Sequence, residues 1–405
     1  MEVKSYLKKH HGEATLLGIC PMAEEIVRAA ILEARETGYI PMFIATPRQV
    51  DADRGYTGWS QAAFVNFVKV TADKLGYDGD YIVARDHGGP YQSFRDRDKA
   101  KVSTATAMNY AKELFYEDLK AGFDVIHVDA TEDPKVSGRL ELTEIAKRTA
   151  QLILSIEKVR VKEGLSSVSY EVGTEEIVGG MTDPSSFQSF LDLLTEEIDN
   201  QAIMDTLVFV VGQVGTTMRI NMINDFDREQ AEKLTTIAAE YGLFLKVHYT
   251  DWLNDSVLSD FPKIGIGAAN VGPEFAASLL RGLIELEQRE ANALSEINRE
   301  DQQSNYFKVL QELAVDRAPW PKFVPEGVKD KDLESYALEN KKNIALCVGR
   351  YVMNEPRAKS AQRKLYKNIR EYTEIDDIES FIIDRIGQTI HRYVESFDLG
   401  DNSSG

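Results

Sequence analysis

The chain has 405 residues, of which 43% are hydrophobic and 28% charged, a composition typical of a globular protein with a sizeable core. Its net charge of −19 argues against nucleic acid as a partner, because phosphate backbones are bound by basic surfaces. No run of the sequence approaches the roughly 18 apolar residues that a membrane span needs, so no membrane partner is expected.

The first residues of the chain carry two adjacent lysines followed by polar residues, without the apolar stretch of a secretory signal. Only two cysteines occur, Cys20 and Cys347, and they lie far apart in the sequence. This spacing predicts no disulfide framework, and we expect Cys20 to be a buried packing residue rather than part of a site. Together these features favour a cytoplasmic protein.

Eight short apolar runs precede residue 273, and segments with helical periodicity separate most of them. The predicted helix over 23–38 ends on Gly38, and the one over 60–76 begins at Ser60 and ends on Gly76, which are typical capping residues. Strands that alternate with helices predict a parallel sheet, and eight of them predict a closed TIM (β/α)₈ barrel over residues 1–290. The eight runs span residues 15–21, 40–47, 81–87, 125–131, 168–175, 206–215, 243–249 and 263–272.

An open dinucleotide-binding sheet is disfavoured, because no G-x-G-x-x-G motif opens a helix after the first strand. Residues 291–405 contain helical and polar segments, a Pro-rich break at 319–325 and no further clear strand. We therefore predict an α-helical C-terminal extension that packs on the barrel or on a partner chain. The polar tail after residue 397 is expected to be disordered.

Histidines and carboxylates gather where the predicted strands end, which in a TIM barrel is the mouth that holds the active site. Asp86 and His87 end the third strand, and His248 ends the seventh. Two histidines and one carboxylate can hold a divalent ion and leave positions open, so His87, His248 and Glu171 are predicted to bind Zn²⁺. The alternative is that these histidines make structural hydrogen bonds at the strand ends.

Further polar residues share faces of the same strands. His127 and Asp129 lie two residues apart, and Glu171 and Glu175 lie four apart, so each pair points to one side of its strand. Asp86, Asp129 and Glu175 are the predicted proton-transfer residues. The alternative for Glu175 is a solvated loop, and the alternative for His127 is a role in the packing around the site.

Substrate contacts are expected from four residues in the loops that follow the strands. Gln213 ends the sixth strand, where its amide is able to bind a hydroxyl group or replace a metal ligand. The segment NVGPEF places Pro273 at a helix start, so backbone N–H groups near Gly272 are candidates for holding a phosphate. Side-chain contacts are expected from Asp251 and Arg54, and Arg54 is alternatively a plain surface charge.

Six motifs follow one another along the barrel: GYTGW (55–59), DHGGP (86–90), IHVDAT (126–131), YEVGTEE (170–176), VHYTDW (247–252) and NVGPEF (270–275). In this order they resemble the Z-type subunit family of class II D-tagatose-1,6-bisphosphate aldolase, and the resemblance covers about residues 10–285. The resemblance implies a TIM barrel. Founding members of the family are described as non-catalytic partners of a catalytic Y-type aldolase subunit, and related barrels are metal-dependent C4 epimerases of ketoses.

The class II aldolases are a looser comparison. In them an Asp-His pair follows the third strand, with the histidine on zinc and the aspartate as acid and base, and further zinc histidines lie on strands six and seven. Asp86, His87 and His248 match this pattern, but Gln213 occupies the strand-six position. The resemblance therefore implies that Glu171 or Asp129 completes the coordination, and that His127 lies behind the ligands.

We accordingly predict a metal-dependent enzyme that acts on tagatose- or fructose-type ketohexose phosphates by retro-aldol or enolate chemistry. The reaction is either aldol cleavage, as in tagatose-bisphosphate aldolase, or epimerisation at C4. The alternative is a non-catalytic subunit that stabilises a separate Y-type catalytic subunit. A homo-oligomer is also expected.

Overall fold

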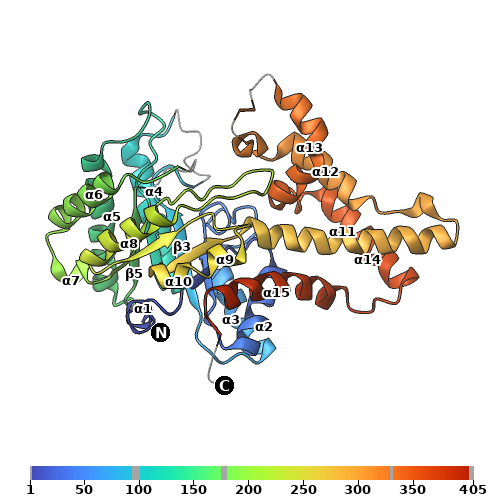
Figure 1. Cartoon of the computed structure of the whole chain (residues 1–405), viewed down its shortest axis with the longest axis horizontal. Coiled ribbons are helices and arrows are strands. Elements are labelled where there is room, and N and C mark those ends of the chain that lie inside the picture. Colours follow the sequence, from blue (N-terminus) through green and yellow to red (C-terminus); the bar gives the residue numbers. More distant parts are fainter. Residues whose placement is uncertain (1, 94–100, 175–179, 326, 329–331, 401–405) are drawn as a thin grey trace.

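The computed structural model describes residues 2–93, 101–174, 180–325, 327–328 and 332–400. Eight parallel strands follow one another in chain order and close into a barrel in which the first strand pairs with the last, confirming the predicted TIM barrel (Figure 1). The strands are β1 (Leu16–Ile19), β2 (Met42–Ala45), β3 (Ile82–Gly88), β4 (Val125–Val128), β5 (Ser169–Gly173), β6 (Leu207–Val211), β7 (Phe244–Val247) and β8 (Ala268–Val271).

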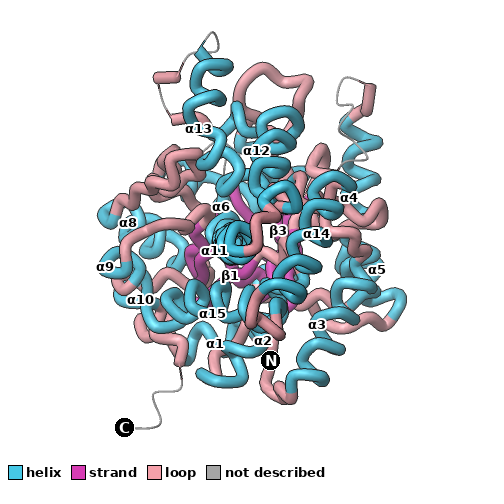
Figure 2. The backbone as a smooth tube through the Cα atoms, turned by 90° about the vertical axis from the view of Figure 1, so that its right-hand side faces the viewer, coloured by secondary structure: helices cyan, strands magenta, loops and turns pink. Residues whose placement is uncertain are grey.

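Helices connect the strands and surround the barrel (Figure 2). The predicted caps are present: Ser60 accepts a hydrogen bond from the Ala63 N–H, and both Gly38 and Gly76 have left-handed backbone conformations. The long connecting helices are α2 (Glu24–Thr37), α3 (Gln61–Leu75), α4 (Thr104–Ala121), α5 (Leu142–Glu163), α6 (Pro184–Ile198), α8 (Arg228–Glu240) and α11 (Pro273–Glu296). The shorter helices are α1 (Val3–Lys9), α7 (Gln201–Met204), α9 (Asp255–Leu258) and α10 (Phe261–Ile264).

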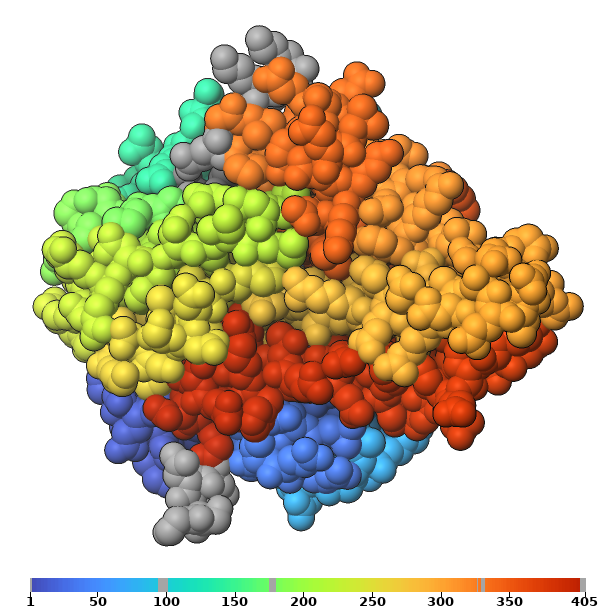
Figure 3. All heavy atoms as spheres, turned by 45° about the vertical axis from the view of Figure 1, so that its right-hand side comes forward, coloured from blue at the N-terminus to red at the C-terminus, as the bar shows by residue number. Residues whose placement is uncertain are grey.

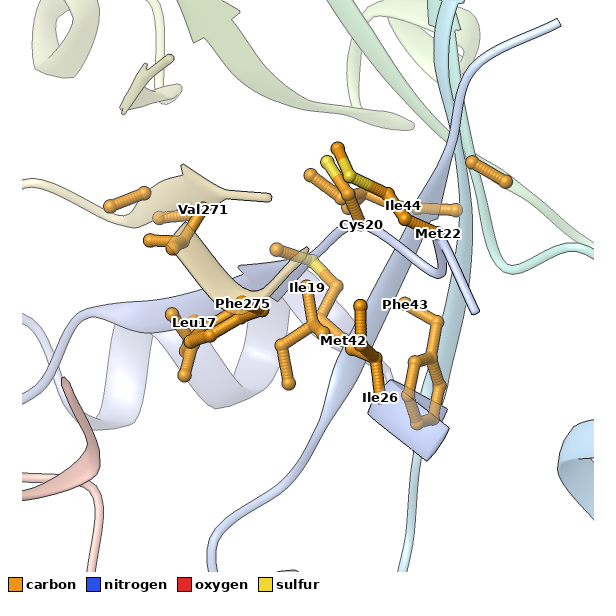
Figure 4. Close-up of a cluster of buried hydrophobic side chains, with 14 of the residues drawn as sticks. Leu17, Ile19, Cys20, Met22, Ile26, Met42, Phe43, Ile44, Val271 and Phe275 are labelled. Atoms are coloured by element: carbon orange, nitrogen blue, oxygen red, sulfur yellow. The ribbon is translucent and has the colours of Figure 1, made fainter. Parts of the chain in front are cut away.

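The main hydrophobic core lies between the barrel and the helices around it. On β1, Leu17 and Ile19 are fully buried and face a layer that includes Ile26 of α2 and Phe275 of α11 (Figure 4). Because both faces of every strand are covered, the strands are continuous apolar runs interrupted by a few polar residues. The polar residues that point into the barrel form the candidate site.

The C-terminal region continues α11 and then folds back on the barrel. Its helices are η2 (Glu300–Gln302), α12 (Tyr306–Arg317), η3 (Trp320–Phe323), α13 (Leu333–Val348), η5 (Gly349–Tyr351), α14 (Pro356–Tyr372) and α15 (Ile378–Ser396). Helix α15 lies between α2 and α11 (Figure 3), where the Tyr393 hydroxyl donates to Glu274 at 2.5 Å and His391 contacts Glu33 at 2.6 Å. The predicted boundary at residue 290 falls inside α11, which runs unbroken from the barrel into the extension.

In the described part of the chain, no helix has both the length and the apolar character required to cross a lipid bilayer.

Candidate metal centre at the barrel mouth

Successive side chains of β3 point to opposite faces, so Arg85 forms a structural ion pair outside the barrel whereas Asp86 belongs to the candidate site inside it. Arg85 points outward, is fully buried and donates to both carboxylate oxygens of Asp118 on α4, at 2.8 and 2.5 Å. Asp86, the next residue, points into the barrel. Arg85 also donates to the carbonyl oxygens of Ala45 and Val50, each at 2.8 Å, and so holds β3 against the segment around β2.

Four inward side chains from different strands bring their donor atoms together inside the barrel. Asp86, His127, Glu171 and His248 are all buried, and one ligand atom from each lies within 4.8 Å of all the others. The Glu171 Oε1 atom lies 3.2 Å from His248 Nε2 and 3.4 Å from His127 Nδ1. Asp86 Oδ1 lies 3.7 Å from His248 Nε2 and 3.8 Å from His127 Nδ1.

These separations fit a divalent metal ion. Nitrogen and oxygen ligands bind Zn²⁺ at about 2.1 Å, and in a tetrahedral arrangement two such ligands are about 3.4 Å apart. The two distances from Glu171 lie close to this value, and those from Asp86 are slightly longer. The buried Nε2 atom of His127 has no hydrogen-bond partner among the described residues, whereas its Nδ1 atom, from which these distances are measured, also accepts a hydrogen bond from the backbone N–H of His87 at 3.2 Å.

Two neighbouring side chains orient the carboxylates of this group. Lys246, fully buried on β7, donates from Nζ to Glu171 Oε2 at 2.6 Å, and leaves Oε1 to face the histidines. Asn270 on β8 donates to Asp86 Oδ1 at 3.2 Å. Gly18 on β1 is required beside it, since a Cβ atom at this position would lie 2.4 Å from Asn270 Oδ1.

The sequence-based prediction missed Lys246 and Asn270. Lys246 lies two residues before His248 and therefore on the same face of its strand, so the alternation that selected His248 would have selected it as well. Asn270 lies in the motif NVGPEF, in which only the glycine and the following helix start were considered.

The electrostatics of the group favour ionised carboxylates. Burial raises the pKa of Glu171, but Lys246 and the two nearby histidines outweigh it and hold the pKa at about 2. Burial likewise raises the pKa of Asp86, and His87 and His248 more than compensate, so that this carboxyl has a pKa well below its usual range. Two carboxylates that remain charged at neutral pH are suited to bind a cation.

His87 lies outside the four-donor group, although it was expected to be a metal ligand. Its backbone has a φ of 48°, which breaks the alternation along β3. The ring therefore lies between Asp129 Oδ2, 2.9 Å from its Nδ1, and His248 Nδ1, 3.2 Å from its Nε2. His127, expected behind the ligands, takes part in the donor group instead.

Asp129 contacts His87 on the side of the ring opposite His248. Its Oδ2 atom accepts a hydrogen bond from Gln92 at 2.9 Å in addition to its contact with His87, and its Oδ1 atom accepts from the Thr131 hydroxyl at 2.5 Å. Burial raises the pKa of Asp129, whereas the hydrogen bond and charge of His87 lower it, with a net pKa of about 2.

The expected phosphate site at the start of α11 is not available, and this corrects the prediction for Asp251 and Gly272. The Oδ1 atom of Asp251 accepts hydrogen bonds from the backbone N–H groups of Gly272 at 3.0 Å and Glu274 at 2.7 Å. Pro273 has no N–H group, so the carboxylate of the chain itself occupies the position that a phosphate would need. Burial raises the pKa of Asp251 to about 7.

The remaining predicted residues are not members of the four-donor group. Arg54 is exposed in the turn after β2, with a left-handed backbone. Gln213 is buried after β6, where its backbone N–H donates to the Thr182 hydroxyl at 2.8 Å. Glu175 lies outside the described residues. Cys20 and Cys347 are buried and free, and the burial of Cys20 agrees with the role in packing expected for it.

A closed eight-stranded barrel with histidine and carboxylate donors at the carboxyl ends of its strands defines a TIM-barrel protein with a candidate metal centre. Residues 3–396 match the model of the D-tagatose-1,6-bisphosphate aldolase subunit GatZ/KbaZ-like family, and the chain belongs to this family.

Relatives of known name agree with this assignment. The D-tagatose-1,6-bisphosphate aldolase subunit GatZ of Escherichia coli O1:K1 / APEC is 25% identical over 342 residues, which cover 79% of this chain and 78% of that protein. GatZ of Escherichia coli strain K12 / MC4100 / BW2952 is 26% identical over 355 residues, covering 82% of this chain and 81% of that protein.

Solved structures show the same fold. A probable tagatose 6 phosphate kinase from Sinorhizobium meliloti 1021 superposes with a TM-score of 0.76 at 20% identity, covering 94% of this chain and all of that one. Fructose-bisphosphate aldolase from Campylobacter jejuni superposes with a TM-score of 0.53 at 11% identity, covering 98% of this chain and 94% of that one.

Proposed function

We propose that the protein is a metal-dependent enzyme that acts on ketohexose phosphates of the tagatose or fructose type. The observation that carries the proposal is the buried group of Asp86, His127, Glu171 and His248, whose separations fit the coordination shell of Zn²⁺. The family of the chain, and the tagatose-bisphosphate aldolase named for its relatives, support a sugar phosphate as the substrate class.

In this proposal His127, Glu171 and His248 hold the ion, and Asp86 carries a proton. Asp86 has the longer separations of the four, and catalytic zinc sites keep three protein ligands and an open position. A divalent ion bound there would polarise the carbonyl and hydroxyl oxygens of a ketose. Lys246 would keep Glu171 oriented as a ligand through its hydrogen bond to Oε2.

His87 and Asp129 form a second proton-carrying pair at the edge of the site. His87 is 15% exposed on its side chain, more than any member of the four-donor group. Asp129 engages Nδ1 at 2.9 Å and His248 Nδ1 lies 3.2 Å from Nε2, so a substrate hydroxyl that exchanges a proton with Nε2 would replace the contact with His248. In aldol cleavage, a base removes the proton from the C4 hydroxyl as the C3–C4 bond breaks, and the acid later protonates C3.

The same acids and bases serve either of two outcomes. If the two fragments leave, the reaction is aldol cleavage. If the aldehyde fragment rotates before the C3–C4 bond forms again, the product is the C4 epimer. Both outcomes need the same proton transfers, so the site residues are compatible with each.

Metal binding and turnover test the proposal together. The purified protein is stripped of metal, titrated with Zn²⁺ by calorimetry, and assayed with tagatose 1,6-bisphosphate, tagatose 6-phosphate and fructose 6-phosphate. We expect tight binding of one ion, and at least a 100-fold loss of affinity in His127→Ala, Glu171→Gln and His248→Ala. His10→Ala, a half-exposed histidine near the N-terminus, is the control and retains full affinity.

Absence of metal binding and of turnover on all three sugars would overturn the enzyme proposal. It would then favour the second candidate function, a non-catalytic subunit that stabilises a separate catalytic aldolase subunit. The word "subunit" in the name of the GatZ relatives is the observation in its favour. Its positive test is an increase in the thermal stability and activity of a Y-type catalytic subunit when the two chains are mixed.

A further inference from the structure

The C-terminal extension places a short segment, residues 347–354, across the mouth of the barrel. At one end, the Cys347 thiol donates to the backbone oxygen of Arg219, in the loop after β6, at 3.7 Å. At the other end, the Asn354 side chain donates to the backbone oxygen of Tyr56, in the loop after β2, at 3.1 Å. Strands β2 and β6 lie opposite each other in a closed barrel of eight, so the segment spans the mouth from side to side.

Arg350 lies in the middle of this segment and is only 4% exposed. Its guanidinium group packs 4.5 Å above the ring of Tyr351 and contacts the Met218 sulfur at 3.6 Å. Its hydrogen bonds go to the carbonyl oxygen of Cys347 and the hydroxyl of Tyr351, both neutral groups, and within the described part of the chain its Nε atom has no partner. Among the described residues, no carboxylate lies within 4 Å of it.

The positive charge of Arg350 affects the pKa values of two buried residues at the ends of the strands, Cys20 and Asp251. Burial raises the pKa of the Cys20 thiol at the end of β1, the carboxylates of Asp86 and Asp251 raise it further, and Arg350 opposes them. Arg350 and Asp86, a member of the four-donor group, therefore both lie near enough to Cys20 to shift the pKa of its thiol. It also lowers the pKa of Asp251, which burial has raised.

A guanidinium group that is buried without an anion is costly, and the cost disappears when an anion binds beside it. Its planar N–H groups match the oxygens of a phosphate or a carboxylate. We propose that Arg350 binds the anionic group of the sugar substrate, either a phosphate or a carboxylate, and that the C-terminal extension thereby completes the active site. This inference rests on the proposed function for the identity of the substrate as a sugar, but not for the binding of an anion.

Anion binding is measured first, on metal-free protein, so that no bound ion contributes. Inorganic phosphate is expected to raise the thermal unfolding temperature of the wild type, and the apparent Kd is expected to increase at least 10-fold in Arg350→Gln. Arg363→Gln, which removes an exposed arginine of α14, is the matched control and binds phosphate as the wild type does. Arg350→Lys keeps the charge without the planar geometry, and should recover part of the affinity even if Arg350→Gln folds poorly.

Kinetics then identify the source of the anion. A ketohexose phosphate, a keto-hexuronate and the uncharged ketohexose are compared as substrates of the metal-loaded protein. For the anion that Arg350 binds, KM is expected to rise by about 10- to 100-fold in Arg350→Gln, whereas kcat/KM for the uncharged sugar stays the same.

The two measurements separate the two proposals. Phosphate binding that is the same in Arg350→Gln and the wild type, or absent from both, overturns the assignment of Arg350. Turnover of a sugar phosphate with an unchanged KM in Arg350→Gln also overturns it, and leaves the proposed function intact. Phosphate binding that depends on Arg350 in a protein without turnover supports the anion site and removes the proposed function.

Discussion

The ion pair between Lys246 and Glu171 offers a quantitative test of the electrostatics inside the barrel. Both side chains are fully buried, and Lys246 is the largest of the groups that lower the pKa of Glu171. The carboxyl has a pKa of about 2, against an ordinary value of 4.5. This difference corresponds to about 3 kcal/mol of stability at neutral pH, the same size as the cost of breaking a buried pair.

Replacing Lys246 with methionine keeps most of the apolar stem of the side chain but removes Nζ, which also lies 5.5 Å from the centre of the Phe209 ring, and so leaves the Glu171 charge buried without its main partner. In metal-free protein at pH 7, we expect Lys246→Met to lower the free energy of unfolding by about 3 kcal/mol. Urea denaturation followed by tryptophan fluorescence and circular dichroism measures this change. Lys233→Met, which breaks the exposed pair with Glu229, is the control and should cause no measurable loss.

The pH dependence gives a second readout of the same pair. Because the pKa of Glu171 is lower in the folded protein, its contribution is present above pH 4.5 and is lost as the pH falls toward 2. This acid-dependent loss should be smaller in Lys246→Met. A free energy of unfolding within 1 kcal/mol of the wild type at pH 7 would refute the reasoning, since it would mean that the Glu171 charge does not depend on Lys246.

Two further substitutions test the surroundings of the site. Gly18→Ala places a Cβ atom 2.4 Å from Asn270 Oδ1, so we expect a stability loss of about 1–3 kcal/mol and at least a 10-fold loss of activity, measured by urea denaturation and steady-state kinetics. Gly387→Ala, with no atom within 4 Å of the new Cβ, is its control, and equal effects of the two would contradict this account. Asp251 has a raised pKa of about 7, so its neutral form contributes stability at low pH that is lost as the pH rises through 7. Asp251→Asn retains the acceptor for the α11 N–H groups and should raise the free energy of unfolding at pH 8 by about 2–4 kcal/mol. If the stability of the wild type does not change from pH 4 to pH 8, Asp251 is not neutral in the folded protein.

The strands and helices of the barrel were predictable because their signals are local. Apolar runs of four to eight residues, helical periodicity and capping residues such as Ser60 and Gly76 each depend on neighbours in the sequence. Eight strands that alternate with helices then leave a closed parallel barrel as the expected arrangement. The same pattern placed Glu171 and His248 at the mouth, where the structure brings them within 3.2 Å of each other.

The detailed arrangement of the site could not be predicted, because it depends on contacts between strands and on single backbone angles. The positive φ of His87 turns its ring toward Asp129, and the pairing of β4 with β5 sets His127 beside Glu171 instead. Residue types alone do not indicate that Asp251 would occupy the start of α11 in place of a phosphate.

The sequence by itself therefore determined that this chain forms a TIM barrel with acids and histidines at its mouth, since periodicity and strand ends are properties of short segments. Only the tertiary structure decided which four of these side chains share a centre, and that Lys246 neutralises one of them. It also decided that the segment around Arg350, far along the chain, contacts the loops after β2 and β6. Such placements arise from packing between distant segments, which no local pattern encodes.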